Sequence, residues 1–243
     1  GDNSLLYFHQ YQNAPANSPL ALRARTGTNI AQKGTLFDVL RDDVAKGQLP
    51  QVSYIAAPEA YSEHPNWPAN YGAWYISQVL DILTSDPDLW SRTVLLINYD
   101  EDGGFFDHMI APTPAANAQQ GGSTVSTQNE FFPGDKSHPA GPYGLGVRVP
   151  LIAVSPWSRG GYVNSQLFDH TSIIRFLEAR FAGKNGGLIE SNITAWRRSV
   201  AGDLTSVFNF DTPNEKLPRL PSTARLSPPD RLRHDDDVIA PPV

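Results

Sequence analysis

The acid-rich run from Asn98 to His108 is the feature that most constrains this chain. It reads Asn-Tyr-Asp-Glu-Asp-Gly-Gly-Phe-Phe-Asp-His and follows residues 93–97, a short apolar run that is typical of a buried strand. Four acidic residues and a histidine therefore lie at or just past a strand's C-terminal end, which is where open α/β sheets bind ligands. Because carboxylates this close repel one another, a bound cation or protonation of some of them is expected.

The composition permits an enzyme and excludes several other classes. A chain of 243 residues with 40% hydrophobic residues can form one large α/β domain or most of one. A net charge of −6 argues against binding of nucleic acid, which usually requires a basic face. No apolar stretch reaches the roughly 18 residues of a membrane span. There is no cysteine, which excludes disulfides and thiol chemistry. Because no initiator Met is present, the start at Gly1 is interpreted as processed or excised.

Strand-like and helix-like segments alternate along the chain. Apolar residues at helical spacing predict helices over 35–46, 69–83 and 172–181, and short apolar runs predict strands over 51–56, 94–97 and 149–154. Thr35 is the expected N-cap of the first helix, and Gly47 its stop. This alternation predicts an α/β fold with a mostly parallel sheet and helices on both faces.

Two segments break the alternation. Residues 111–146 are rich in Gly, Pro, Ser, Thr, Gln and Asn, which is typical of a lid or an insertion loop. Residues 211–243 are dense in proline and are interpreted as a wrapping arm or a linker. The sequence therefore predicts a domain over 1–210 followed by this arm.

Further polar residues follow other predicted elements. His64 comes after the predicted strand 51–56 and just before a helix, so it is a candidate for the same sheet edge as the acids. Asp169 or Thr171 is expected to cap the helix that starts at residue 172, and His170 between them is interpreted as structural.

A calcium-binding loop of the EF-hand type is the non-enzymatic interpretation of the acidic run. Asn98, Asp100, Asp102 and Gly103 match loop positions 1, 3, 5 and 6. Position 12 would be Met109, where a bidentate Glu is required, and a strand rather than a helix precedes the loop. Both mismatches argue against this interpretation.

Three motifs occur in order along the chain. They are Glu63-His64-Pro65, the acidic run over 100–108, and Val149-Pro150-Leu151-Ile152-Ala153-Val154-Ser155-Pro156-Trp157. Together they resemble the bacterial phosphoesterase family, which contains phosphatidylcholine-hydrolysing phospholipases C and related acid phosphatases. Residues 168–172, Phe-Asp-His-Thr-Ser, also match the family pattern. The resemblance runs from about residue 34 to residue 181 and is closest to the phospholipase C branch.

The resemblance implies an alkaline-phosphatase-like fold and metal-dependent phosphoester hydrolysis. It suggests Asp100 and Glu101 as ligands of a divalent metal ion, which could be Ca²⁺, Mg²⁺, Mn²⁺ or Zn²⁺. It suggests His64 as a catalytic histidine that stabilises the charge on the phosphate or protonates the leaving oxygen. His108 is the second catalytic candidate, facing the phosphate or orienting a ligand.

The family pattern also contains parts that this sequence lacks. The family begins with a Glu-Asn-Arg-Ser-Phe-Asp motif that supplies two further metal ligands, and a Ser or Thr nucleophile follows it. Neither is present here, so we expect the C-terminal part of a catalytic domain, whose companion is an N-terminal fragment of the same protein. We further expect a secreted or periplasmic bacterial enzyme that contacts membrane surfaces transiently and binds no nucleic acid.

Two alternatives to a phospholipase C stay open. One is an acid phosphatase of the same family, and the other is a divalent-cation-binding module without turnover. A choline head group favours an aromatic cage. The choice between a phospholipase C and an acid phosphatase therefore depends on loop 111–146 and on the aromatic residues Tyr143, Trp157 and Tyr162.

Overall fold

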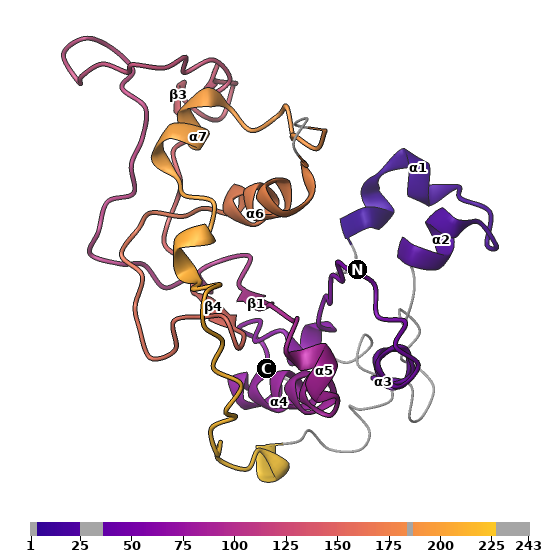
Figure 1. Cartoon of the computed structure of the whole chain (residues 1–243). Helices are drawn as coiled ribbons and strands as arrows, with labels where there is room; N and C mark the ends of the chain where they lie inside the picture. Colours follow the sequence, from indigo (N-terminus) through magenta and orange to yellow (C-terminus); the bar gives the residue numbers. More distant parts are fainter. Residues whose placement is uncertain (1–3, 25–35, 184–186, 227–243) are drawn as a thin grey trace. The chain divides into compact units, whose positions relative to one another are not determined.

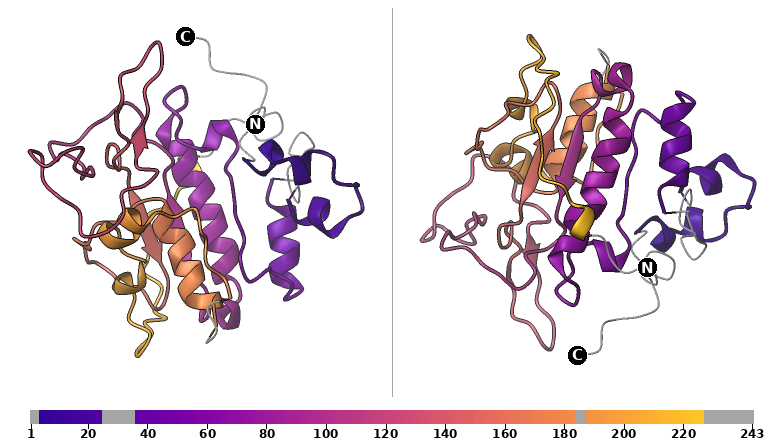
Figure 2. Two further views of the ribbon diagram at one scale, coloured as in Figure 1. Left: turned by 90° about the horizontal axis from the view of Figure 1, so that it is seen from above. Right: turned by 90° about the horizontal axis from the view of Figure 1, so that it is seen from below.

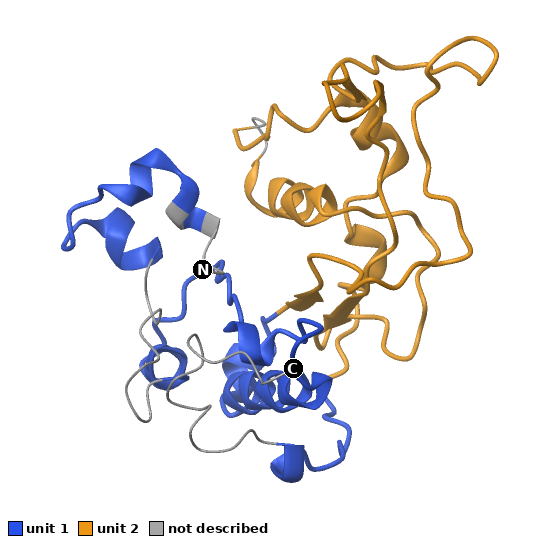
Figure 3. Ribbon diagram, turned by 180° about the vertical axis from the view of Figure 1, so that it is seen from behind, with its two compact units in different colours: residues 1–93, 216–243 blue, residues 94–215 orange. Residues whose placement is uncertain are grey.

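The computed structural model describes residues 4–24, 36–183 and 187–226, and these divide into two compact units. Unit 1 comprises residues 1–93 and 216–243, and unit 2 comprises residues 94–215 (Figure 3). The described elements of unit 1 are η1 (Ser4–Tyr7), α1 (His9–Gln12), α2 (Pro19–Ala24), α3 (Asp38–Ala45), η2 (Glu59–Tyr61), α4 (Ala69–Thr84), α5 (Pro87–Trp90) and η4 (Ala224–Leu226). Those of unit 2 are β1 (Leu95–Asn98), β2 (Phe131–Phe132), β3 (Gly141–Pro142), β4 (Leu151–Val154), α6 (Thr171–Phe181), α7 (Ala195–Val200) and η3 (Thr205–Val207) (Figure 1).

Unit 1 is built around α4. Its buried side chains Tyr75, Val79, Ile82 and Leu83 recur at the spacing of one helix face. Phe37, at the start of α3, packs its ring 4.9 Å from that of Tyr75, so α3 is attached to the same helix. Segment η4 lies along α4, as the right-hand view of Figure 2 shows.

The three predicted helices are present. They are α3, α4 and α6, and their observed ends differ from the predicted ones by at most a few residues. The predicted cap Thr35 lies outside the described residues. None of the helices in the described ranges is long and apolar enough to cross a membrane.

The predicted strand over 51–56 is wrong. These residues form no regular structure, and the side chains of Val52, Tyr54 and Ile55 are exposed. A strand is stabilised by ladder hydrogen bonds and cross-strand contacts with a neighbour. No such ladder forms here within the described part of unit 1.

The prediction of a mostly parallel sheet is also wrong for the described residues. Strands β1 and β4 form an antiparallel ladder in which Leu95 pairs with Val154 and Asn98 with Leu151. The physical reason is the connection between them, because parallel strands need a crossover that is usually a helix. Residues 99–150 contain no helix, so the chain returns in the opposite direction.

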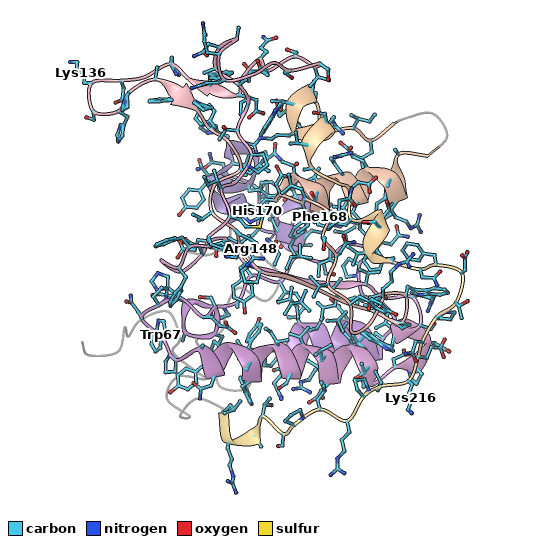
Figure 4. All side chains as sticks on the ribbon, turned by 90° about the vertical axis from the view of Figure 1, so that its left-hand side faces the viewer. Trp67, Lys136, Arg148, Phe168, His170 and Lys216 are labelled. Atoms are coloured by element: carbon cyan, nitrogen blue, oxygen red, sulfur yellow. The ribbon has the colours of Figure 1, made fainter. Side chains whose placement is uncertain are left out.

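The long loop 111–146 contains the second ladder, an antiparallel pair of β2 and β3. Lys136 lies in the turn between these strands, which projects from the unit in Figure 4. Residues 211–226 of the proline-rich segment are irregular apart from η4, and residues 227–243 lie outside the described part.

Candidate functional site

The acidic turn leaves the end of β1. Asp100 and Glu101 are exposed, and Gly103 and Gly104 take left-handed backbone angles, with φ of 62° and 84°. These angles favour glycine, and they reverse the chain so that the amide of Phe105 donates to the carbonyl of Asp102 at 3.1 Å. The turn therefore presents carboxylate oxygens, the donors that hard divalent cations prefer, to the solvent.

This pair of acids is not a complete metal site. Within residues 4–24, 36–183 and 187–226, no group of three or more His, Asp or Glu side chains is placed to hold a metal ion. The donor chemistry of Asp100 and Glu101 fits a divalent cation. Such cations take about six oxygen ligands, so two carboxylates alone would not complete the coordination.

The antiparallel pairing of β1 with β4 places Arg148 at the end of the ladder from which the acidic turn leaves. The amide of Tyr99 donates to the carbonyl of Pro150 at 3.3 Å, so the ladder extends just beyond Asn98 and Leu151. Arg148 lies two residues before Pro150, ahead of β4. The acidic turn begins directly after Tyr99, at the end of β1. A parallel sheet would have placed Trp157 there instead, so the sequence pattern does not indicate Arg148 as a site residue.

Arg148 and His108 are joined through Asp107. The Arg148 guanidinium forms an ion pair with Asp107 Oδ2, but the two groups do not have hydrogen-bond geometry. The Arg148 side chain is 76% exposed. Asp107 Oδ1 accepts from the backbone amide of His108 and lies 2.7 Å from its Nδ1. The predicted catalytic His108 is thus exposed but oriented by a neighbouring carboxylate.

His170 reaches the same turn from the start of α6. Its Nε2 lies 2.9 Å from the carbonyl oxygen of Tyr99, the residue before Asp100. Asp169 Oδ1 accepts from the backbone amide of Thr171 at 3.0 Å and from its hydroxyl at 2.6 Å. The prediction that Asp169 or Thr171 is the N-cap of α6 is wrong, because His170 occupies that position without a side-chain cap and Asp169 binds Thr171 from the residue before it.

A buried ion-pair network supports the start of α6. Arg197 of α7 donates from Nη1 to Asp169 at 3.0 Å and from Nη2 to the carbonyl of Gly144 at 2.8 Å. Its Nε lies 3.3 Å from Glu130 Oε1, and Glu130 is 1% exposed. The hydroxyl of Thr194 donates to the same Glu130 oxygen. This network therefore connects the loop before β2, the start of α6 and helix α7.

His64 belongs to the other unit. It is exposed and follows Glu63, whose φ of 65° is left-handed, and its Nδ1 accepts from the amide of Asn66 at 3.4 Å. A neutral His64 with Nδ1 as acceptor carries its proton on Nε2. The structure thus gathers Asp100, Glu101, His108, Arg148 and His170 around one ladder end of unit 2, and His64 lies in unit 1.

The aromatic residues that bear on head-group choice contact different neighbours. The ring of Tyr143 lies 6.2 Å from that of Phe132, and the ring of Trp157 lies 6.1 Å from that of Phe210. Tyr162 is 81% exposed. These contacts do not favour an aromatic cage.

The exposed turn thus offers carboxylate oxygens that suit a divalent cation, and Arg148 pairs with Asp107 a few residues further along the chain. Residues 1–183 match the Phosphoesterase family, and the chain belongs to this family. The family assignment made from the sequence is thereby confirmed.

Named relatives resemble the chain over most of its length. It is 60% identical over all of its residues to the "Non-hemolytic phospholipase C" of Burkholderia pseudomallei, covering 34% of that protein. It is 49% identical over 86% of its length to the "Hemolytic phospholipase C" of Pseudomonas aeruginosa, covering 26% of it. It is 30% identical over 82% of its length to the "Non-specific phospholipase C6" of Arabidopsis thaliana, covering 39%. The chain thus spans about a third of these relatives' length.

Proposed function

We propose that the chain is part of a metal-dependent phospholipase C, which cleaves phospholipids such as phosphatidylcholine to diacylglycerol and a phosphorylated head group. The observation that carries this proposal is the 60% identity, over the whole chain, to a protein named phospholipase C. The exposed acidic pair at the end of β1 supports it chemically, because hydrolysis of a phosphodiester needs neutralisation of negative charge. Since the chain spans about a third of that relative, the activity belongs to a longer protein.

Asp100 and Glu101 are the residues that would hold the metal in this proposal. A divalent cation bound there would neutralise phosphoryl oxygens and lower the pKa of a nucleophile. The turn leaves a hydrogen-bonded ladder, so it supplies these two carboxylates from a fixed position. The other ligands and the nucleophile come, in this proposal, from an N-terminal portion of the same protein.

The histidines and Arg148 have separate roles. His64 stabilises charge on the transferring phosphoryl group or protonates the leaving oxygen. His108, oriented by Asp107, faces the phosphate. Arg148 adds a cation beside the acidic turn, and a guanidinium matches the geometry of phosphate oxygens.

We further propose that the complete catalytic domain has the alkaline-phosphatase-like arrangement and works outside the cytoplasm, at the periplasm or beyond. Its substrate lies in a lipid surface, which the enzyme contacts transiently. The bacterial relatives named phospholipase C support this proposal.

The test is to replace the acidic pair in the complete enzyme. Asp100→Asn or Glu101→Gln should abolish hydrolysis of p-nitrophenylphosphorylcholine and lower the bound metal, with the far-ultraviolet circular dichroism unchanged. Losing a ligand should cost several kcal/mol of transition-state stabilisation. Asp135→Asn, an exposed acid in the β2–β3 turn, is the matched control.

Near-normal turnover of either variant at saturating metal would contradict the proposal. Comparison with p-nitrophenyl phosphate separates the acid phosphatase from the phospholipase C, since only a phosphatase prefers the monoester. Metal binding by the complete protein without turnover of either compound would identify a cation-binding module.

A further inference from the structure

We propose that His170 is a positioning residue, which fixes the metal-binding turn by donating a hydrogen bond from Nε2 to the carbonyl oxygen of Tyr99. The two atoms lie 2.9 Å apart, and the residues come from α6 and from the end of β1. The role in metal binding rests on the proposed function, whereas the control of backbone geometry does not.

The accepting carbonyl lies where the ladder stops. Tyr99 makes the last ladder contact, through its amide to the carbonyl of Pro150, and the exposed residues Asp100 and Glu101 follow. The carbonyl of Tyr99 shares a planar peptide unit with the amide of Asp100. A hydrogen bond to this oxygen therefore fixes the plane from which the Asp100 side chain departs.

The donor is held from the other side. His170 has helical backbone angles, with φ of −59° and ψ of −26°, at the N-cap of α6. Its neighbour Asp169 binds Thr171 and the Arg197 guanidinium, which also pairs with buried Glu130. Because the backbone on both sides of His170 is already ordered, little further entropy is lost when its ring binds Tyr99.

The hydrogen bond also fixes the tautomer that His170 uses here. A carbonyl oxygen only accepts, so Nε2 must carry the proton. That nitrogen is therefore committed to Tyr99. In this proposal His170 acts through Tyr99 on the orientation of the acidic turn.

Hydrogen exchange of the complete enzyme without metal tests the positioning directly. His170→Ala should speed exchange of the amides of Tyr99 and Phe105, which close the ladder and the turn, by about tenfold. It should leave that of Leu95, which faces β4 at the far end of the ladder, unchanged. His170→Gln, which retains a side-chain N–H donor, should restore most of the protection. His138→Ala is the matched control, because this exposed histidine also bonds a neighbour in unit 2, Asp135.

Unchanged exchange in His170→Ala overturns the proposal. Faster exchange throughout unit 2 also overturns it, since that result would show a general structural role. Failure of His170→Gln to restore protection, in a variant with wild-type circular dichroism, would show that the donated hydrogen bond is not the cause.

Metal affinity of the complete enzyme provides the second readout. The dissociation constant for Mn²⁺, measured by electron paramagnetic resonance, should rise about 10- to 100-fold in His170→Ala and much less in His170→Gln. Faster exchange at Tyr99 together with an unchanged Mn²⁺ constant overturns the role in metal binding. If Asp100→Asn also leaves that constant unchanged, the proposed metal site itself is wrong, so the two failures are distinguishable.

Discussion

Arg148, just before β4, forms an ion pair with Asp107, the acid that follows the Gly103-Gly104 turn. The other oxygen of the same carboxylate pairs with His108. Asp107 thus holds both a cation and a histidine. Its own side chain is only 10% exposed, whereas both partners are largely exposed. Under the proposed function, in which His108 and Arg148 contact an anionic substrate, Asp107 is the residue that orients them.

The first prediction follows from this arrangement. Asp107→Asn in the complete enzyme should lower kcat/KM for p-nitrophenylphosphorylcholine about 10- to 100-fold, because both partners lose their orienting charge. The unfolding midpoint should change little, since Arg148 is mostly exposed and exposed ion pairs contribute about 0–1 kcal/mol.

Asp135→Asn provides the control for this prediction. Asp135 pairs with His138 at 3.0 Å in the β2–β3 turn, so it repeats the Asp–His contact away from the acidic turn. Equal kinetic effects of the two substitutions would show that the Asp107 contacts have no special role.

The second prediction concerns His64. If it stabilises charge or transfers a proton, His64→Ala should lower kcat by roughly two to four orders of magnitude. The metal content of the purified enzyme, measured by atomic emission, should stay at the wild-type value. Loss of the metal together with activity would instead identify His64 as a ligand, contrary to the proposed role.

The third prediction concerns Gly72, which packs against the residue before His64. A Cβ on Gly72 of α4 would lie 2.4 Å from Cγ of Glu63, the residue before His64. Gly72→Ala should therefore displace Glu63 and destabilise the protein by about 1–3 kcal/mol, although alanine favours a helix. It should also lower kcat, because the turn that carries His64 moves.

Ala73→Gly is the control for the Gly72 substitution. Ala73 is exposed on the same helix, so this change should cost about 1 kcal/mol through helix propensity alone and leave kcat unchanged. Thermal unfolding and steady-state kinetics of both variants test the prediction. A Gly72→Ala protein with wild-type stability and turnover would contradict it.

The fourth prediction concerns the pH dependence of stability. Hydrogen bonds from Arg198 lower the pKa of the Glu178 carboxyl to about 2, with a smaller lowering from the Glu190 amide and an opposing effect of burial. Because this pKa is depressed in the folded state, its stabilisation is present above the ordinary value of 4.5 and is lost as the pH falls towards 2.

Glu178→Gln tests that dependence. The substitution should lower the free energy of unfolding by about 1–3 kcal/mol at pH 7, because the buried pair with Arg198 is broken. The difference from wild type should shrink as urea unfolding is repeated from pH 4.5 towards pH 2. Asp42→Asn, which breaks an exposed pair with Lys46, should change stability little at any pH. A difference that stays constant with pH would contradict the assignment.

The helices and the acidic turn could be predicted from the sequence because their signals are local. Apolar spacing along α4 and α6 defines a helix face, and the Gly103-Gly104 pair requires a sharp turn wherever the rest of the chain goes. The contact of Asp169 with Thr171 at the start of α6 is local in the same sense.

The direction of pairing and the residues it assembles could not be predicted in this way. Alternating elements favoured a parallel sheet, and the antiparallel ladder depends on a connection, residues 99–150, that forms no helix. Arg148 and His170 therefore joined the acidic turn only through contacts between residues far apart in the sequence. The absence of a helical pattern in 111–146 was the signal that could have indicated an antiparallel return.

The last prediction concerns the isolated chain. It contributes Asp100 and Glu101, whereas a hard cation takes about six oxygen ligands and ligand number sets much of its affinity. In the proposed function the nucleophile comes from an N-terminal portion of the protein, so in the chain alone an incoming water would be poorly positioned. The purified polypeptide 1–243 should therefore hydrolyse p-nitrophenylphosphorylcholine no faster than metal ions alone. Adding an N-terminal portion should restore turnover if the two pieces associate. Robust hydrolysis by the purified chain, with no second polypeptide in its mass spectrum, would show that these 243 residues contain a complete catalytic site.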